Sequence, residues 1–152
     1  EKTEQASTYI HKLAGVYRYM IKSEEEQLVP LEEELQFVEK YVDLMTVRFP
    51  DGLKVEIDIP QEQMSRFILP CSLLIENATK HNVISAANPL VISIKADSEN
   101  ICVINNIIPK VTQVSSTGLG QKYIRQQYLN LCGKEIEISH NENEYKVVIP
   151  LI

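Results

Sequence analysis

The sequence lacks several features that would assign a function class at once. Its three cysteines, Cys71, Cys102 and Cys132, form no CxxC pair, and an odd number of widely spaced thiols is typical of a reduced cytoplasmic protein. No apolar run approaches the roughly 18 residues that a membrane-spanning helix needs, and no signal peptide opens the chain. Basic charge is also scarce. With a net charge of −6, the chain is not expected to bind nucleic acid.

What remains is the composition of an ordinary globular protein. The 152 residues are 44% hydrophobic and 24% charged, which suits one compact domain, alone or with a helical extension. The chain opens in helix-like sequence without an initiator Met, so we expect a fragment of a longer protein. The acidic excess lies mainly in residues 24–39, so an anionic ligand elsewhere would need local attraction.

Hydrophobic periodicity predicts two helices before residue 49. Apolar residues from Tyr9 to Ile21 recur at three- and four-residue steps, and this seam has to pack on the next helix or on a partner subunit. Pro30 precedes a second helix that extends to about Arg48. The glutamates at 32–34 fall in its first turn, where the helix dipole favours negative charge. They indicate a helix start and a solvated face more simply than a metal site.

Alternating apolar and polar residues predict the strands of a sheet. These strands are expected at 53–59, 90–96, 101–106, 135–139 and 145–149. Further helices are expected after Pro70 and from the Gly118 region to about Cys132, with Gly133 as a C-cap. Helices interspersed with hairpins predict an α+β fold in which one mixed sheet is covered on one face by helices, a two-layer α/β sandwich.

The stretch LPCSLLIENATKHN, residues 69–82, has the most unusual helical pattern. At about 100° per residue, four polar side chains share an arc of roughly 140° on this helix: Glu76, Asn77, Lys80 and His81. Apolar residues, among them Ala78, lie on the opposite side and would bury the helix. The polar face is compatible with ligand binding and equally with solvation, so the rest of the chain has to decide.

Two other stretches contain residues that are able to bind a ligand. Thr117-Gly118-Leu119-Gly120 follows a long loop at a predicted helix start, where glycines let the backbone approach a ligand and free N–H groups attract phosphate. A single Gly-x-Gly also serves ordinary tight turns. Asn105-Asn106 ends a strand, where the two amides either hydrogen-bond a base or form a turn.

Taken in order along the chain, these features resemble the ATP-binding domain of the GHKL superfamily. More narrowly, they resemble the catalytic region of LytS-type sensor histidine kinases, whose pattern is Pro-x-x-x-Leu-x-x-Glu-Asn-Ala-x-Lys-His. The matching residues here are Pro70, Leu74 (shifted by one from some members), Glu76, Asn77, Ala78, Lys80 and His81. The resemblance extends over nearly the whole chain. It implies a Bergerat-type ATP-binding fold preceded by helices of the dimerisation region. Residues 1–49 would be the helical segment and residues 50–152 the catalytic domain.

The resemblance also implies roles for single residues. Asn77 would supply an amide oxygen to Mg²⁺, a cation that prefers oxygen ligands. Glu76 would orient a metal-bound water or polarise the attacking imidazole, and Lys80 and His81 would lie near the triphosphate of ATP. The loop and helix start at Thr117, Gly118, Leu119 and Gly120 would surround the phosphates. Asn105 and Asn106 would lie at the adenine base.

The implied activity is ATP-dependent phosphorylation of a histidine upstream of Glu1. That acceptor lies in a Pro-His-Phe motif that this chain does not contain, and His11 lacks those neighbours. The implied partners are a second copy, which pairs through the N-terminal helices, and the receiver domain of a response regulator. The full protein is expected to be anchored in the bacterial inner membrane with this part in the cytoplasm.

The chain departs from the family pattern on the adenine side. Where the family commonly has Asp-x-Gly-x-Gly, this chain has Asn105, Asn106, Ile107 and Ile108. A carboxamide oxygen accepts a hydrogen bond without the charge assistance of a carboxylate. Gln121 and Tyr123 also replace the usual Leu and Asn. Two alternatives therefore stay open: a degenerate pseudokinase or scaffold with this fold, and an unrelated ATPase of the same superfamily.

Overall fold

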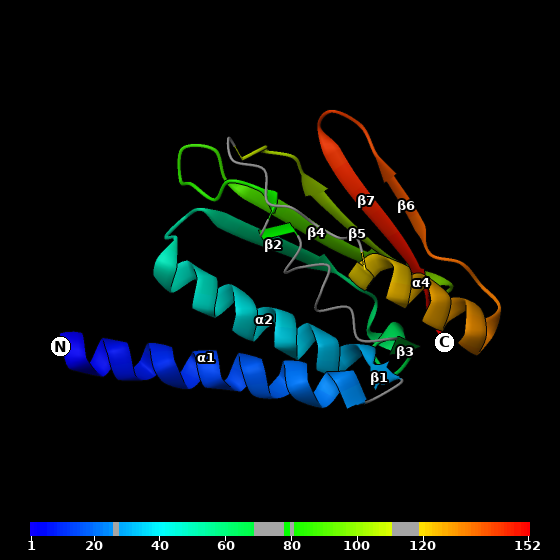
Figure 1. Ribbon diagram of the computed structural model, residues 1–152, viewed down its shortest axis with the longest axis horizontal. Coiled ribbons are helices and arrows are strands. Elements are labelled where there is room, and N and C mark those ends of the chain that lie inside the picture. The colour runs from blue at the N-terminus through cyan, green and yellow to red at the C-terminus, as the bar shows by residue number, and fades with distance from the viewer. Residues whose placement is uncertain (26–27, 69–77, 80, 111–118) are drawn as a thin grey trace.

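Figure 1 shows a computed structural model of the protein, which describes residues 1–25, 28–68, 78–79, 81–110 and 119–152. Two long helices run antiparallel, side by side, and the second of them lies along one face of a twisted sheet. The helices are α1 (Lys2–Glu25), α2 (Leu31–Arg48) and α4 (Leu119–Cys132), and a short 3-10 turn spans Gln61–Gln63. No helix of the described part is long and apolar enough to cross a membrane.

The sheet has five strands in the order β2-β4-β5-β7-β6. Their bounds are β2 (Leu53–Asp58), β4 (Leu90–Ala96), β5 (Asn100–Asn106), β6 (Glu137–His140) and β7 (Glu144–Pro150). β2 pairs with β4 in parallel, and the other neighbours are antiparallel. The sheet is therefore mixed, as the sequence predicts.

The core lies between this sheet and the helices α2 and α4. Alternate residues of the central strands point into it, because successive side chains of a strand face opposite sides. Leu31, Leu35 and Val38 of α2 and the fully buried Tyr128 of α4 join the same hydrophobic cluster. The two-layer α/β sandwich expected from the sequence is confirmed.

A second, smaller cluster joins the two long helices. It consists of Val16 from α1 with Phe37 and Leu44 from α2, and Tyr9, Leu13, Tyr19 and Tyr41 pack against it. Of the apolar seam predicted for α1, the part with Tyr9, Leu13 and Val16 packs on the next helix, and another part does not. Ile10, Tyr17 and Ile21 lie on another side of α1 and are 57–63% exposed.

A small two-stranded sheet was not predicted from the sequence. β1 (Val29–Pro30) lies in a segment expected to be a loop, and it pairs antiparallel with β3 (Phe67–Ile68). Phe67 in turn exchanges backbone hydrogen bonds of 2.8 and 2.9 Å with Ile152. This pairing ties the start of α2 to the last strand of the main sheet.

Arg66 reinforces this tie with its guanidinium group. It donates hydrogen bonds to the backbone carbonyls of Ser98, Leu151 and Ile152 at 2.9 to 3.3 Å. The backbone carbonyl of Arg66 accepts a hydrogen bond from the N–H of Leu31 at 2.8 Å. One residue therefore joins the entry of α2, the β4–β5 turn and the end of β7.

Two expectations about burial were wrong, and one about a helix end is confirmed. Glu34 belongs to the acidic run that was expected to be solvated, yet it is 4% exposed because it faces inward on α2. Ile57 was expected on the buried face of its strand but is 38% exposed, since β2 is an edge strand. Gly133 caps α4 with a φ of 67° and donates its N–H to the carbonyl of Leu129.

Candidate functional site

Half of the site predicted from the sequence lies in segments outside the described residues. Glu76, Asn77 and Lys80 of the polar helix belong to this group, as do Thr117 and Gly118 of the Gly-x-Gly stretch. Their roles stay predictions. The described members of the site are His81, Asn105, Asn106, Leu119 and Gly120.

The polar helix is described at Ala78, Thr79 and His81, and all three are helical. Ala78 and Thr79 are each 6% exposed, and Ala78 belongs to the main hydrophobic cluster. His81 is half-buried. The apolar side of the predicted helix therefore faces the core at Ala78, as the periodicity predicted.

Asn82 fixes the end of this helix to the segment that follows β5. Its amide oxygen accepts a hydrogen bond from the N–H of Ile108 at 2.8 Å, and its amide nitrogen donates to the carbonyl of Ala78 at 2.9 Å. A β-bridge to Pro109 and a hydrogen bond from the N–H of Val83 to the carbonyl of Ile108 extend the contact. Asn82 is 5% exposed; its hydrogen bond to Ala78 is buried and the one from Ile108 is partly buried.

Asn105 lies on β5, on the same side as the buried Ile101 and Val103. It is 5% exposed, and its amide nitrogen donates to the carbonyl of Asn106 at 2.8 Å. Within the part of the chain that the structure describes, no hydrogen bond reaches its amide oxygen. An amide oxygen that is free of protein donors and faces the helix side of the sheet is suited to receive a hydrogen bond from a ligand's amino group.

Asn106 has a different environment, although it follows directly in sequence. Its amide oxygen accepts from the N–H of Val91 at 2.7 Å, and its amide nitrogen donates to the carbonyl of Pro89 at 3.1 Å. Both polar groups thus hold the start of β4 against the end of β5. Of the two side chains, only that of Asn105 has an amide oxygen that no described residue engages, so it is the one able to accept a hydrogen bond from a ligand.

The N–H groups that follow these amides are also engaged. Ile107 donates its N–H to the carbonyl of Asn143, and Ile108 donates to Asn82. This backbone is therefore fixed by protein contacts at the place where the family pattern has glycines. On the other side of the site, Leu119 and Gly120 begin the described part of α4.

The titratable groups with shifted pKa values lie away from these residues. Burial raises the pKa of the Cys102 thiol, against the opposing effect of Lys146 and Lys95, so the thiol stays protonated. Hydrogen bonds from the N–H groups of Glu99 and Asn100 lower the pKa of Asp97 in the β4–β5 turn. The described residues contain no group of three or more His, Cys, Asp and Glu side chains that could hold a metal ion.

These elements define a class of protein. The class is one of fold: the α+β sandwich is similar to the catalytic domains of histidine kinases, the GHKL fold expected from the sequence. Solved structures support the fold. The catalytic domain of histidine kinase ThkA matches with a TM-score of 0.55 at 14% identity, covering 81% of this chain and 95% of that one.

Two further histidine kinases have similar structures. Acinetobacter baumannii histidine kinase AdeS matches with a TM-score of 0.52 at 16% identity, covering 98% of this chain and 79% of that chain. The cytoplasmic segment of histidine kinase QseC matches with a TM-score of 0.50 at 19% identity. The match covers 79% of this chain and 74% of that chain. At such identities the likeness shows the fold alone.

The sequence comparisons point in the same direction. Residues 1–53 match the family model described as histidine kinase. Sensor protein kinase HptS of Staphylococcus aureus is 29% identical over 126 residues, which cover 82% of this chain and 22% of that protein. The chain thus spans about a fifth of the length of the curated relatives it matches. It resembles sensor histidine kinases, as the motifs indicated, and none of these matches distinguishes the narrower LytS type.

Sequence reasoning missed two residues that shape the site. Asn82 stands at the end of the motif, but its hydrogen bond to Ile108 joins residues 26 positions apart, which no local pattern reveals. The second is Tyr41, whose hydroxyl forms a hydrogen bond with the hydroxyl of Thr79, 38 positions further along the chain. The two oxygens are 2.8 Å apart. A polar Thr on the buried side of an amphipathic helix was the available signal, because a buried hydroxyl needs a partner.

Proposed function

We propose that this chain is the ATP-binding catalytic region of a two-component sensor histidine kinase. The fold and the resemblance to sensor kinases support the class. The observation that carries ATP binding is the amide oxygen of Asn105, which accepts no hydrogen bond from the described residues and lies on the helix-facing side of the sheet, beside the segment that Asn82 fixes to the polar helix. In this position the oxygen accepts a hydrogen bond from the adenine amino group.

The remaining site residues hold the phosphates and the metal ion. Asn77 offers its amide oxygen to Mg²⁺, and Lys80 and His81 neutralise the triphosphate. Glu76 orients a water or the attacking imidazole, and residues 117–120 surround the phosphates at the start of α4. Bound ATP supplies the phosphoryl group, and the protein contributes mainly position and charge. Asn106 holds the edge of this site, because both its amide groups bind the backbone of β4.

The acceptor is a histidine that precedes Glu1 in the full protein, and the phosphoryl group passes from it to the receiver domain of a response regulator. A second copy is the other partner. Ile10, Tyr17 and Ile21 form an exposed apolar strip at seven- and four-residue steps on α1, and a paired helix would cover it. The full protein is anchored in the membrane by segments outside this chain.

The experiment uses the complete protein with γ-labelled ATP and Mg²⁺. We expect label that is stable in base, is lost in acid and maps to a histidine upstream of this chain. Replacement of that histidine by Gln serves as the control and removes the label. A folded complete protein that acquires no such label contradicts kinase activity, and ATP hydrolysis without phosphohistidine would favour the ATPase alternative.

A second candidate is a pseudokinase that keeps the fold and signals through helix pairing. Asn105 stands where the family has Asp, and Ile107, whose N–H is bound to the carbonyl of Asn143, stands where the family has a glycine. If Asn105→Asp converts a chain that does not bind Mg·ATP into one that does, the pseudokinase is the better description. Binding by the unmodified chain excludes it.

A further inference from the structure

Helix α2 takes part in both hydrophobic clusters of the molecule. Leu31, Leu35 and Val38 contribute to the core below the sheet, whereas Phe37 and Leu44 contribute to the cluster with α1. Tyr41 packs against both clusters. A change in how α1 packs on α2 therefore reaches the core of the sandwich at this side chain.

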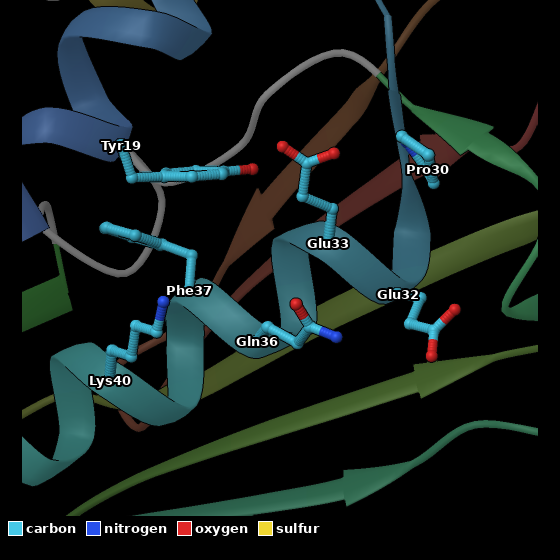
Figure 2. Close-up of a pocket in the computed structure, with 7 residues that line it drawn as sticks. All are labelled: Tyr19, Pro30, Glu32, Glu33, Gln36, Phe37 and Lys40. Atoms are coloured by element: carbon cyan, nitrogen blue, oxygen red, sulfur yellow. The ribbon is translucent and has the colours of Figure 1, made fainter. Parts of the chain in front are cut away.

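An aromatic stack leads from α1 to Tyr41. The rings of Tyr19 and Phe37 are nearly parallel, with centroids 4.7 Å apart and an interplanar angle of 20°. Figure 2 shows the two rings stacked at one side of a cavity of about 430 Å³. The ring of Phe37 also lies against Tyr41, with 6.1 Å between centroids and a tilt of 33°. Such contacts are sensitive to geometry, because aromatic pairs prefer offset or tilted arrangements.

The hydroxyl of Tyr41 then reaches the polar helix. It lies 2.8 Å from the hydroxyl of Thr79, and Thr79 is 6% exposed. In the sequence Thr79 stands two residues after Asn77 and directly before Lys80. Thr79 is therefore close in sequence to two residues that the proposed function assigns to Mg²⁺ and the triphosphate.

We propose that Tyr41 is a positioning residue of the nucleotide site, coupling the packing of α1 on α2 to the helix turn around Thr79. The inference rests on the proposed function, because it names the residue through which the N-terminal helices regulate the same site. When α1 shifts against α2, the stack of Tyr19 and Phe37 repacks and Tyr41 is displaced. The Tyr41–Thr79 hydrogen bond then lengthens, and the nucleotide ligands lose their alignment. Packed contacts of this kind switch between discrete arrangements instead of deforming continuously.

The test combines Mg·ATP titration with amide hydrogen exchange of the same variants. Tyr41→Phe and Thr79→Val each remove one hydroxyl and keep the shape, whereas Thr79→Ser keeps the hydroxyl. Thr46→Val is the matched control, because it removes an exposed hydroxyl of α2. Exchange at residues 78–82 reports on the helix turn, and exchange in β5 and β7 reports on global stability.

We expect Tyr41→Phe and Thr79→Val each to weaken Mg·ATP binding by about threefold to tenfold, the range of one buried hydrogen bond. The effect of the double variant should be smaller than the sum of the two single effects, because both changes remove the same Tyr41–Thr79 hydrogen bond. Thr79→Ser and Thr46→Val should bind like the parent chain. Amide exchange should rise at residues 78–82 but stay unchanged in β5 and β7. A general loss of stability would raise exchange in β5 and β7 as well.

A third variant tests the aromatic contacts that join α1 to Tyr41. Tyr19→Leu removes the stacked ring and should raise exchange at 78–82 in the parent chain but not in the Tyr41→Phe background. Unchanged binding and exchange in Tyr41→Phe and Thr79→Val overturn the inference, as do strictly additive effects in the double variant. A parent chain that binds no Mg·ATP refutes the proposed function instead. The exchange data alone then decide whether Tyr41 holds the helix turn.

Discussion

Replacing Asn82 by Ala should destabilise the protein more than its position at the end of a helix suggests. The side chain makes a buried hydrogen bond to the carbonyl of Ala78 and accepts a partly buried one from the N–H of Ile108. Alanine removes both and leaves each backbone group without this partner. The substitution therefore disconnects the end of the polar helix from the segment that follows Asn105.

The magnitude follows from these contacts. Each neutral hydrogen bond contributes about 1 kcal/mol net, and a buried group left without a partner costs about 1–3 kcal/mol. For a residue that is 5% exposed, we expect the free energy of unfolding to fall by about 2–4 kcal/mol in Asn82→Ala. For a domain of this size that corresponds to a fall in Tm of about 5–15 °C.

Urea unfolding followed by far-UV circular dichroism measures the change, with unaltered m-values as the check for two-state behaviour. Asn88→Ala is the matched control, since Asn88 is exposed and should change stability by less than about 0.5 kcal/mol. If Asn82→Ala loses no more stability than this control, the two hydrogen bonds do not hold the helix end as described.

Three further results are expected. Arg66→Met should lower the free energy of unfolding by about 1–3 kcal/mol, because it removes the hydrogen bonds to the carbonyls of the β4–β5 turn and of the last two residues; urea midpoints equal to those of the parent chain would contradict this. The lowered pKa of Asp97 contributes stability at neutral pH that is lost as pH falls through the folded-state pKa, below the ordinary value of 3.8. The stability difference between the parent chain and Asp97→Asn should therefore shrink between about pH 6 and about pH 3, and a constant difference would exclude this role. Ile10→Lys combined with Tyr17→Lys should reduce self-association in analytical ultracentrifugation, whereas a parent chain that is strictly monomeric would rule out pairing through this strip.

The elements with long, regular patterns were predicted well from the sequence. β4 and β5 alternate buried and half-exposed residues over most of their length, and α2 carries a clear apolar stripe between Pro30 and Arg48. Burial on one face imposes such a period whatever the partner is. The mixed two-layer sandwich followed from their order.

The short pairings could not be predicted, because they have no period. β1 and β3 are two residues long, and β1 contains Pro30, which argues against a strand. Their pairing depends on Arg66 and on the backbone of Ile152, which are distant in sequence. Tertiary contacts override weak local preference at such places.

The amides of the site show the same limit on a finer scale. Asn105 and Asn106 are adjacent and chemically identical, and the sequence leaves both a ligand role and a turn role open. The alternation of the strand separates them. Asn105 points to the buried side, whereas Asn106 binds the backbone of Pro89 and Val91. The register between β4 and β5 decides their roles, and only the fold supplies it.

The most direct test of the central claim is a calorimetric titration of Mg·ATP into this chain and into Asn77→Ala. The proposed function predicts saturable binding to the folded parent chain and loss of the Mg²⁺-dependent part in the variant, with unchanged stability as the control for folding. A titration to about millimolar nucleotide would still detect a binding free energy of about −4 kcal/mol. The absence of binding at that concentration would contradict ATP binding by this domain. Equal binding by Asn77→Ala would remove Asn77 from the metal site.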